Sequence, residues 1–127
     1  MSISIESTVK QFPHTNKLYE EIANAILGKK YELSLVFIGP ARAKKLNEEY
    51  RKKTYSPNVL SFPLDKHAGE IFICPTVAKT QAKRFTLSQD GYVAYLFIHG
   101  CLHLKGHDHS DTMEQLEERY LRRFGIT

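Results

Sequence analysis

The sequence predicts an α+β domain in which a mixed sheet of about four strands is covered by helices mainly on one side, with a central helix that bears a metal site. Strand-like and helix-like periodicities interleave without the regular alternation of a doubly wound fold. No repeat, low-complexity stretch or linker-like change of composition divides the 127 residues. Four of the six histidines fall within residues 99–109. A chain of this length can bury one core without covalent staples, so we expect residues 1–127 to form a single domain.

The first half of the chain carries the patterns of two strands and two helices. Alternation over Ile3–Ile5 predicts a short strand, and apolar residues at helical spacing predict a helix over 16–27. A second strand is predicted over 31–38, because alternate apolar side chains there fall on one face. Pro40 suits the first turn of a helix, which predicts a helix over 41–50. The expected inward-facing residues of the second strand are Leu33, Leu35 and Phe37.

Two short strands, over 59–63 and 70–74, are predicted in the middle of the chain. We expect them to form a hairpin-like pair, although the segment between them is too long for a tight turn. Pro75 is then expected to begin a helix over 76–85, again as a first-turn proline. The basic residues on the exposed face of that helix are Lys79, Lys83 and Arg84.

The longest predicted helix, over 89–105, is apolar on nearly every side, which indicates a buried central helix. Ser88 precedes it as a suitable N-cap. A final helix is predicted from about Asp111, with Glu114 as the acidic partner of a capping box. Its expected inner stripe consists of Met113, Leu116, Tyr120, Leu121 and Phe124.

The histidines of the central helix have the spacing of metal ligands. His99 and His103 are four residues apart, so they project from one face of a helix, one turn apart. Gly106 allows the chain to leave the helix and turn back, which would return His109 to the same point. Three neutral imidazoles leave a tetrahedral ion one open position, which is typical of catalytic rather than structural zinc. We therefore predict a catalytic metal site.

Two further polar residues of this segment, His107 and Asp108, do not have the spacing of metal ligands. His107 follows the glycine bend two residues before His109, and we expect it to face solvent or substrate rather than the ion. Asp108 has two open interpretations. It is either a carboxylate that orients one of the ligand imidazoles or a simple turn residue.

The pattern HxxxHxxGxxH also has the ligand spacing of metzincin peptidases, which read HExxHxxGxxH. The general-base glutamate that follows the first histidine in those peptidases is Gly100 in this chain. A peptidase needs that carboxylate to deprotonate the attacking water and to pass the proton to the leaving amine. The ligand spacing without the base favours metal-dependent hydrolysis of another substrate.

Positive charge is concentrated in residues 42–53. Six basic and two acidic side chains give this segment a charge of +4, equal to the net charge of the whole chain. Such a strip attracts a polyanion such as nucleic acid, or else it is a solvated helix face with internal Glu–Lys pairs. Few aromatic residues punctuate it, so no base-stacking platform is expected there. The basic residues of the strip are Arg42, Lys44, Lys45, Arg51, Lys52 and Lys53.

The two cysteines, Cys74 and Cys101, form no CxxC pair and no disulfide framework. We expect both to be small buried apolar residues. The chain has no signal-peptide pattern, and its longest apolar run, Val93–Ile98, is too short to span a bilayer. These features favour a reduced, cytoplasmic setting without a membrane partner.

Two blocks of this sequence resemble a known family. The first runs His-Gly-x-Leu-His-Leu-x-Gly-x-Asp-His from His99 to His109. The second contains Leu46-Asn47-x-x-Tyr50-Arg51, then Asn58-Val59-Leu60-Ser61-Phe62-Pro63, then Gly69-Glu70-Ile71. Together they resemble the YbeY family of bacterial zinc-dependent endoribonucleases, which act in the maturation of ribosomal RNA.

The resemblance implies a zincin-like α+β domain with one Zn²⁺ per chain, held by His99, His103 and His109. It implies single-strand RNA cleavage in 16S rRNA processing and ribosome quality control, and association with the ribosome or a small-subunit protein. It also implies a catalytic role for Arg51. The usual Gly-Asp-Ile of the family is Gly-Glu-Ile here, so Glu70 keeps a carboxylate for proton transfer.

Several alternatives stay open at this stage. Glu70 or His107 could move protons, and the nucleophile is either metal-activated water or the 2′-hydroxyl of the RNA. A metallopeptidase or another metal-dependent hydrolase would need a base supplied from elsewhere, such as Glu70. A non-catalytic ribosome assembly factor would use zinc for stability alone.

Overall fold

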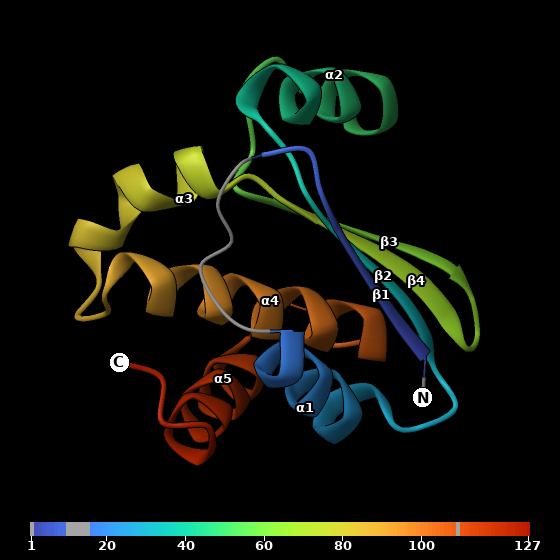
Figure 1. The fold of residues 1–127 in the computed structure, drawn as a ribbon, viewed down its shortest axis with the longest axis vertical. Coiled ribbons are helices and arrows are strands. Elements are labelled where there is room, and N and C mark those ends of the chain that lie inside the picture. Colours follow the sequence, from blue (N-terminus) through green and yellow to red (C-terminus); the bar gives the residue numbers. More distant parts are fainter. Residues whose placement is uncertain (1, 10–15, 109) are drawn as a thin grey trace.

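The computed structural model describes residues 2–9, 16–108 and 110–127. Strands and helices interleave along the chain, as predicted, and Figure 1 shows their arrangement. The elements are β1 (Ser2–Ser7), α1 (Asn16–Leu27), β2 (Glu32–Phe37), α2 (Pro40–Arg51), β3 (Val59–Asp65), β4 (Ala68–Ile73), α3 (Pro75–Gln81), the 3₁₀ helix η1 (Ala82–Arg84), α4 (Gln89–Lys105) and α5 (Asp111–Arg123).

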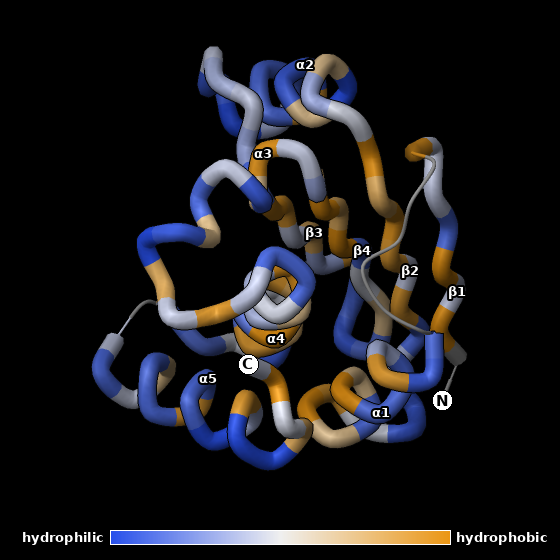
Figure 2. Tube along the Cα trace, turned by 60° about the vertical axis from the view of Figure 1, so that its left-hand side comes forward, coloured by the Kyte–Doolittle hydropathy of each residue, from blue (hydrophilic) through white to orange (hydrophobic). Residues whose placement is uncertain are grey.

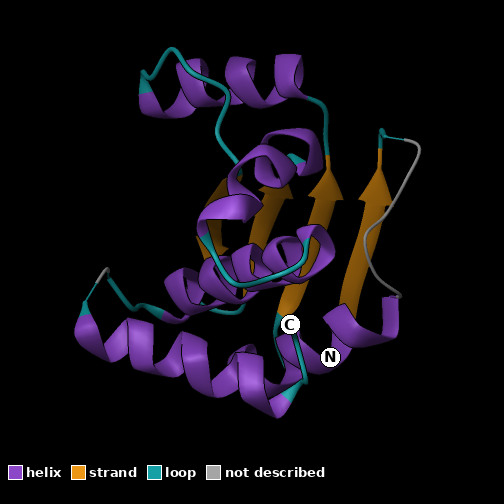
Figure 3. Ribbon diagram, turned by 90° about the vertical axis from the view of Figure 1, so that its left-hand side faces the viewer, coloured by secondary structure: helices purple, strands orange, loops and turns teal. Residues whose placement is uncertain are grey.

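The strands form one mixed sheet in the order β1-β2-β4-β3. β1, β2 and β4 are parallel, whereas β3 pairs with β4 in the antiparallel sense and forms one edge. Figure 3 shows helices stacked over one face of these strands. The predicted α+β architecture with a four-stranded mixed sheet is therefore confirmed.

β3 and β4 form the expected hairpin, but the prediction of a long connection between them was wrong. Both strands extend toward one another beyond their apolar segments, and only residues 66–67 separate them. The backbone N–H of His67 donates to Asp65 Oδ1 at 2.7 Å, which closes the turn. Pro63 is tolerated within β3 because an edge strand needs no second hydrogen-bonded neighbour.

The main core lies between the sheet and helices α1, α4 and α5. Figure 2 shows α4 enclosed by these elements, with the more apolar parts of the chain turned inward. Tyr19 of α1 packs edge-on against Phe97 of α4, with ring centres 5.0 Å apart. Leu33, Leu35 and Phe37 of β2 belong to this core, so their predicted common face is confirmed.

A second, smaller core lies on the opposite face of the sheet. Val36 of β2 and Phe72 of β4 contribute to it, and both alternate with residues of the main core. Ala43 of α2 completes this cluster, so α2 covers that face near the ends of the parallel strands. The other long helices cover the first face, and coverage mainly on one side is as predicted.

The ends of α4 and α5 follow capping rules. Ser88 Oγ accepts from the Gly91 N–H at 2.9 Å, and Gly106 ends α4 in the left-handed region at φ 109°. The N-cap of α5 is Ser110, whose Oγ accepts from the Met113 N–H at 3.2 Å. The predicted capping box through Glu114 was wrong, because the cap lies one residue earlier than expected.

Two further expectations concern the cysteines and the membrane. Cys74 and Cys101 are both buried free thiols, as expected. Across residues 2–9, 16–108 and 110–127, no helix has the length and apolar character that a membrane crossing requires.

Candidate active site

Two histidines of α4 converge at the side of the sheet where β3 forms its edge. The Nε2 atoms of His99 and His103 lie 3.0 Å apart. Their rings meet edge to face, with centres 4.5 Å apart and an interplanar angle of 85°. The i, i+4 spacing therefore places both imidazoles at one point, as the sequence predicted.

The other nitrogen of each ring faces an oxygen acceptor. His99 Nδ1 lies 2.5 Å from Glu117 Oε2, and His103 Nδ1 lies 3.0 Å from the main-chain oxygen of His107. An oxygen acceptor retains the proton on Nδ1, so in the neutral rings Nε2 carries a lone pair. Two lone pairs directed at one point attract a cation, and imidazole nitrogen suits a zinc-type ion.

Glu117 is the carboxylate partner that sequence reasoning missed. It lies on α5, is only 5% exposed, and also accepts from the Tyr95 hydroxyl at 3.4 Å through Oε1. Burial, reinforced by the Glu117 charge, raises the pKa of the Tyr95 phenol, which therefore keeps the proton that it donates. The signal was a glutamate four residues after Met113, within the predicted inner stripe of the last helix.

The turn after α4 supplies the partner of His103. The N–H groups of Gly106 and His107 donate to the carbonyl oxygens of His103 and Leu102, both at 3.0 Å. This Schellman-type closure brings the main chain at residue 107 back over the last helical turn. The predicted glycine turn is thereby confirmed, while Asp108 lies beyond it with an exposed side chain.

The predicted third ligand, His109, lies outside the described residues. Within the part of the chain that is described, no cluster of three histidine, cysteine, aspartate or glutamate side chains could hold a metal. The set of three histidines therefore stays a prediction, supported by the geometry of the first two.

A cavity of about 440 Å³ opens in front of the histidine pair. Arg51 lines this cavity together with His99, His103 and residues 58–61 at the start of β3. The structure thus brings the predicted arginine to the predicted metal ligands, although 48 positions separate Arg51 from His99 in the sequence. The residues of β3 that line the cavity belong to the second sequence block.

Arg51 owes its position to a closed turn at the end of α2. Lys52 adopts a left-handed conformation at φ 55°, and the Lys53 N–H donates to the Asn47 carbonyl at 3.2 Å. Asn47 is fully buried, and its side-chain amide donates to the Tyr55 carbonyl at 3.0 Å. Asn47 therefore anchors the loop after Arg51, a role that its place in the sequence block did not reveal.

The rest of the basic strip lies on the outer surface of α2 and the loop that follows. Its side chains are exposed, and only Arg51 among them lines the cavity. Arg42 lies with its guanidinium carbon 6.0 Å from the centre of the Phe72 ring. The exposed remainder comprises Lys44, Lys45, Lys52 and Lys53, while Lys83 and Arg84 are exposed on η1 and Lys79 is half-buried on α3.

Glu70 lies on the opposite side of the sheet from the histidine pair. Its neighbour Ile71 faces α4, because a Cβ built on Gly100 would lie 3.2 Å from Ile71 Cδ1. Successive side chains of a strand point to opposite faces, so Glu70 shares the other face with Phe72. The structure therefore does not bring Glu70 to the cavity, and its catalytic role stays a prediction.

Gly100 lies where α4 packs closely against the hairpin. Its carbonyl accepts from Ser61 Oγ at 3.4 Å, and an added Cβ would lie 2.9 Å from that oxygen. A side chain at this position would require the side chains of Ser61 and Ile71 to shift. The position that carries the general base in the peptidase motif is occupied in this chain by a glycine that packs against the sheet.

Comparison with known proteins assigns the chain to a family. A family profile described as "Endoribonuclease YbeY" matches residues 2–125. The chain belongs to the YbeY endoribonuclease family. An endoribonuclease YbeY of Cellvibrio japonicus is 33% identical over 140 residues, which cover 98% of this chain and 79% of that protein. One from Bdellovibrio bacteriovorus is 42% identical over 97 residues, which cover 75% of this chain and 62% of that protein.

A solved structure shares the fold of this chain. The solution structure of TM1509 from Thermotoga maritima matches 96% of this chain and 88% of its own, with 27% identity and a TM-score of 0.68. The resemblance expected from the two sequence blocks is therefore confirmed over nearly the whole chain. For this member of the YbeY family, the histidine pair, Arg51 and the start of β3 line one cavity.

Proposed function

We propose that this protein is a zinc-dependent endoribonuclease that acts in the maturation of ribosomal RNA in the cytoplasm. The observation that carries the proposal is the pair of Nε2 atoms 3.0 Å apart, with each Nδ1 held by an oxygen acceptor. His99 and His103 would hold one Zn²⁺ per chain together with His109. The helix that bears this pair beneath an edge strand supports a zincin-like arrangement.

The residues described suit such an ion. Each ring can present its Nε2 lone pair to the ion, because the proton is held on Nδ1. The buried Glu117 carboxylate would balance part of the positive charge of the ion. When bound, zinc supplies Lewis-acid chemistry to an attacking oxygen and to the phosphoryl group. The cavity in front of the pair provides room for a phosphodiester.

Arg51 is the residue of this chain that binds the phosphate. Its guanidinium is a planar fork that matches two phosphate oxygens, and it lines the same cavity as the histidines. Negative charge builds on the non-bridging oxygens as phosphorus is attacked, and a fixed cation beside them lowers the barrier. Arg51 thus orients the scissile phosphate and stabilises its charge.

We propose His107 rather than Glu70 for proton transfer, because Glu70 lies on the face of the sheet away from the cavity. Of the two groups considered from the sequence, His107 remains, half-buried just beyond the end of α4. The attacking oxygen is either that of water or the 2′-hydroxyl of the RNA. Both routes need a single-stranded segment that can bend into the cavity.

The exposed basic side chains of α2 support RNA as the substrate. Arg42, Lys44, Lys45, Lys52 and Lys53 would contact phosphates on either side of the cleaved bond. The substrate in the cell would be precursor 16S rRNA, which the protein would cleave during rRNA processing and ribosome quality control. It would bind this substrate in association with the ribosome or a small-subunit protein. A peptidase is disfavoured, because Gly100 occupies the position of the carboxylate that peptide cleavage needs.

The proposal is tested by metal analysis of the purified protein, coupled to a cleavage assay on precursor rRNA. We expect close to one zinc per chain, endonucleolytic products, and loss of those products when a chelator removes the metal. A peptide library should remain intact. Cleavage that persists after the metal has been removed, or RNA binding without any cleavage in the zinc-loaded protein, would contradict the proposal.

A further inference from the structure

Three aromatic rings gather at one side of the histidine pair. Phe85, just after η1, stacks on Tyr92 with ring centres 4.7 Å apart and an interplanar angle of 29°. Tyr95 lies 5.7 Å from each of these rings. Phe85 is nevertheless 43% exposed, so only part of its ring is covered by the other two. We call these three residues the aromatic wall.

The aromatic wall continues directly into the cavity of the histidine pair. A hollow of about 170 Å³ lies between its rings, Asn58, Val59 and His99. Asn58, Val59 and His99 also line the cavity that contains Arg51. The Tyr95 ring centre is 6.3 Å from that of His99. A volume equal to that of about six water molecules accommodates one planar base rather than a larger ligand.

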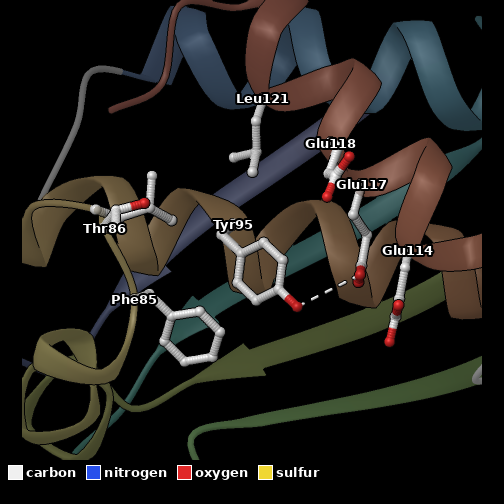
Figure 4. Close-up of a pocket in the computed structure, with 8 residues that line it drawn as sticks. Phe85, Thr86, Tyr95, Glu114, Glu117, Glu118 and Leu121 are labelled. Atoms are coloured by element: carbon white, nitrogen blue, oxygen red, sulfur yellow. Dashed lines mark hydrogen bonds between the residues drawn. The ribbon is translucent and has the colours of Figure 1, made fainter.

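Charge divides the two sides of this region. Beyond Phe85 and Tyr95, a second hollow is lined by Glu114, Glu117 and Glu118, as Figure 4 shows. Among the described residues that line it, there is no lysine or arginine. Phosphates are repelled by these carboxylates and attracted to Arg51 at the opposite end. The backbone of a bound RNA should therefore pass on the Arg51 side, with a base directed at the aromatic wall.

We propose that the aromatic wall is a nucleobase subsite, in which the base next to the scissile phosphate stacks on the exposed part of Phe85. This inference rests on the proposed ribonuclease function and adds to it a positioning element. A base must be unpaired to enter, so the subsite selects single-stranded RNA. Stacking uses the π-face that every base has, and discrimination between bases should therefore be weak.

The chain contains no tryptophan, so Phe85→Trp introduces a single fluorescent reporter at the subsite. The zinc-loaded variant is mixed with a short single-stranded RNA, and fluorescence is read by stopped flow before cleavage. We expect strong quenching by this RNA, and little by a duplex of the same sequence or by the same strand with one abasic ribose. Leu64→Trp provides the control, because Leu64 is exposed near the β3–β4 turn. Equal quenching in the two variants, or none in Phe85→Trp, would overturn the inference.

A second pair of variants separates stacking from folding. The Phe85→Ala substitution should weaken the affinity for the intact strand by about tenfold. The variant should then bind the intact and the abasic strand with equal affinity. Phe85→Tyr keeps an aromatic face and should behave as the parent. Both should retain full zinc and a cooperative melting transition, with a lower melting temperature in Phe85→Ala because the contacts of the ring with Tyr92 and Tyr95 are lost. If Phe85→Ala still distinguishes intact from abasic RNA, Phe85 is not the stacking group.

The readouts distinguish this inference from the function on which it rests. Quenching and affinity are measured without any cleavage. A protein that quenches as expected but never cuts RNA would keep the subsite and lose the nuclease proposal. A protein that cuts RNA without base-dependent quenching would keep the nuclease proposal and lose the subsite.

Discussion

The imidazole of His99 on α4 and the carboxylate of Glu117 on α5 meet at 2.5 Å, between Nδ1 and Oε2. This contact joins the helix that bears the histidine pair to the last helix of the chain. It fixes which nitrogen of His99 faces the cavity, and it places a buried charge directly behind that ring.

Replacing Glu117 should weaken metal binding without removing a ligand. In Glu117→Gln the hydrogen-bonding shape is kept, but the charge behind His99 is lost. We expect zinc affinity to fall by about 10- to 100-fold, as measured by competition with a chromophoric chelator. Glu118→Gln is the matched control, because Glu118 is adjacent and exposed. Equal affinity in the two variants would show that Glu117 has no role in holding the metal.

Removing one ligand should have a larger effect. In His103→Ala, we expect both bound zinc and RNA cleavage to be lost, as followed by elemental analysis and a precursor rRNA assay. His67→Ala changes an exposed histidine in the β3–β4 turn and should retain both. Intact cleavage by His103→Ala would refute the metal role of this residue.

Arg51 should affect turnover but not metal content. Because we propose that its guanidinium contacts the phosphate and not the ion, Arg51→Ala is expected to keep its zinc and lose about 100- to 1,000-fold in kcat. Arg51→Lys should recover only part of this loss, since an ammonium cannot form the two parallel hydrogen bonds. Lys30→Ala, an exposed residue in the turn between α1 and β2 and outside the cavity, provides the control. Loss of zinc in Arg51→Ala would indicate a structural role instead.

RNA affinity should depend steeply on salt. Phosphates that bind lysine and arginine release counterions, so the logarithm of the association constant falls linearly with the logarithm of the salt concentration. Substituting Lys44 and Lys45 together by alanine should reduce the slope by about two. Lys30→Ala, in the turn between α1 and β2, should leave the slope unchanged. A flat salt response in the parent would remove the basic strip from the binding surface.

Close packing at Gly100 predicts a loss of stability on enlargement. Alanine is normally the better helix residue, yet its Cβ would lie 2.9 Å from Ser61 Oγ. We expect Gly100→Ala to lower the free energy of unfolding by about 1–3 kcal/mol in urea titrations. Gly39→Ala is the control, since a Cβ there meets nothing within 4 Å. A stabilised Gly100→Ala variant would contradict the close approach.

Features that depend on local spacing were predictable from the sequence. The periodicity of residues 89–105, the cap at Ser88 and the left-handed Gly106 all follow from neighbouring residues, and the structure has each of them. The common location of His99 and His103 also follows from helical spacing alone. The histidine pair could thus be inferred before any tertiary contact was known.

Features that depend on contacts between distant segments were not predictable in the same way. Glu117 reaches His99 only because α5 packs against α4, and a single sequence does not reveal which helices meet. The face of Glu70 depends on the strand register, where a shift of one residue reverses every side chain. Phe85 was assigned to a helix, although it lies beyond η1 with its ring beside the cavity. In each case the tertiary arrangement decides the role.

The acceptor for His103 belongs to the peptide backbone at residue 107 rather than to a side chain. Any amino acid can supply that carbonyl, so evolution is free to vary the chemistry displayed at position 107 while the ring keeps its orientation. No such freedom exists at position 117, where the acceptor is the side chain itself. One side of the histidine pair is therefore open to adaptation, and the other depends on a side chain that can accept a hydrogen bond.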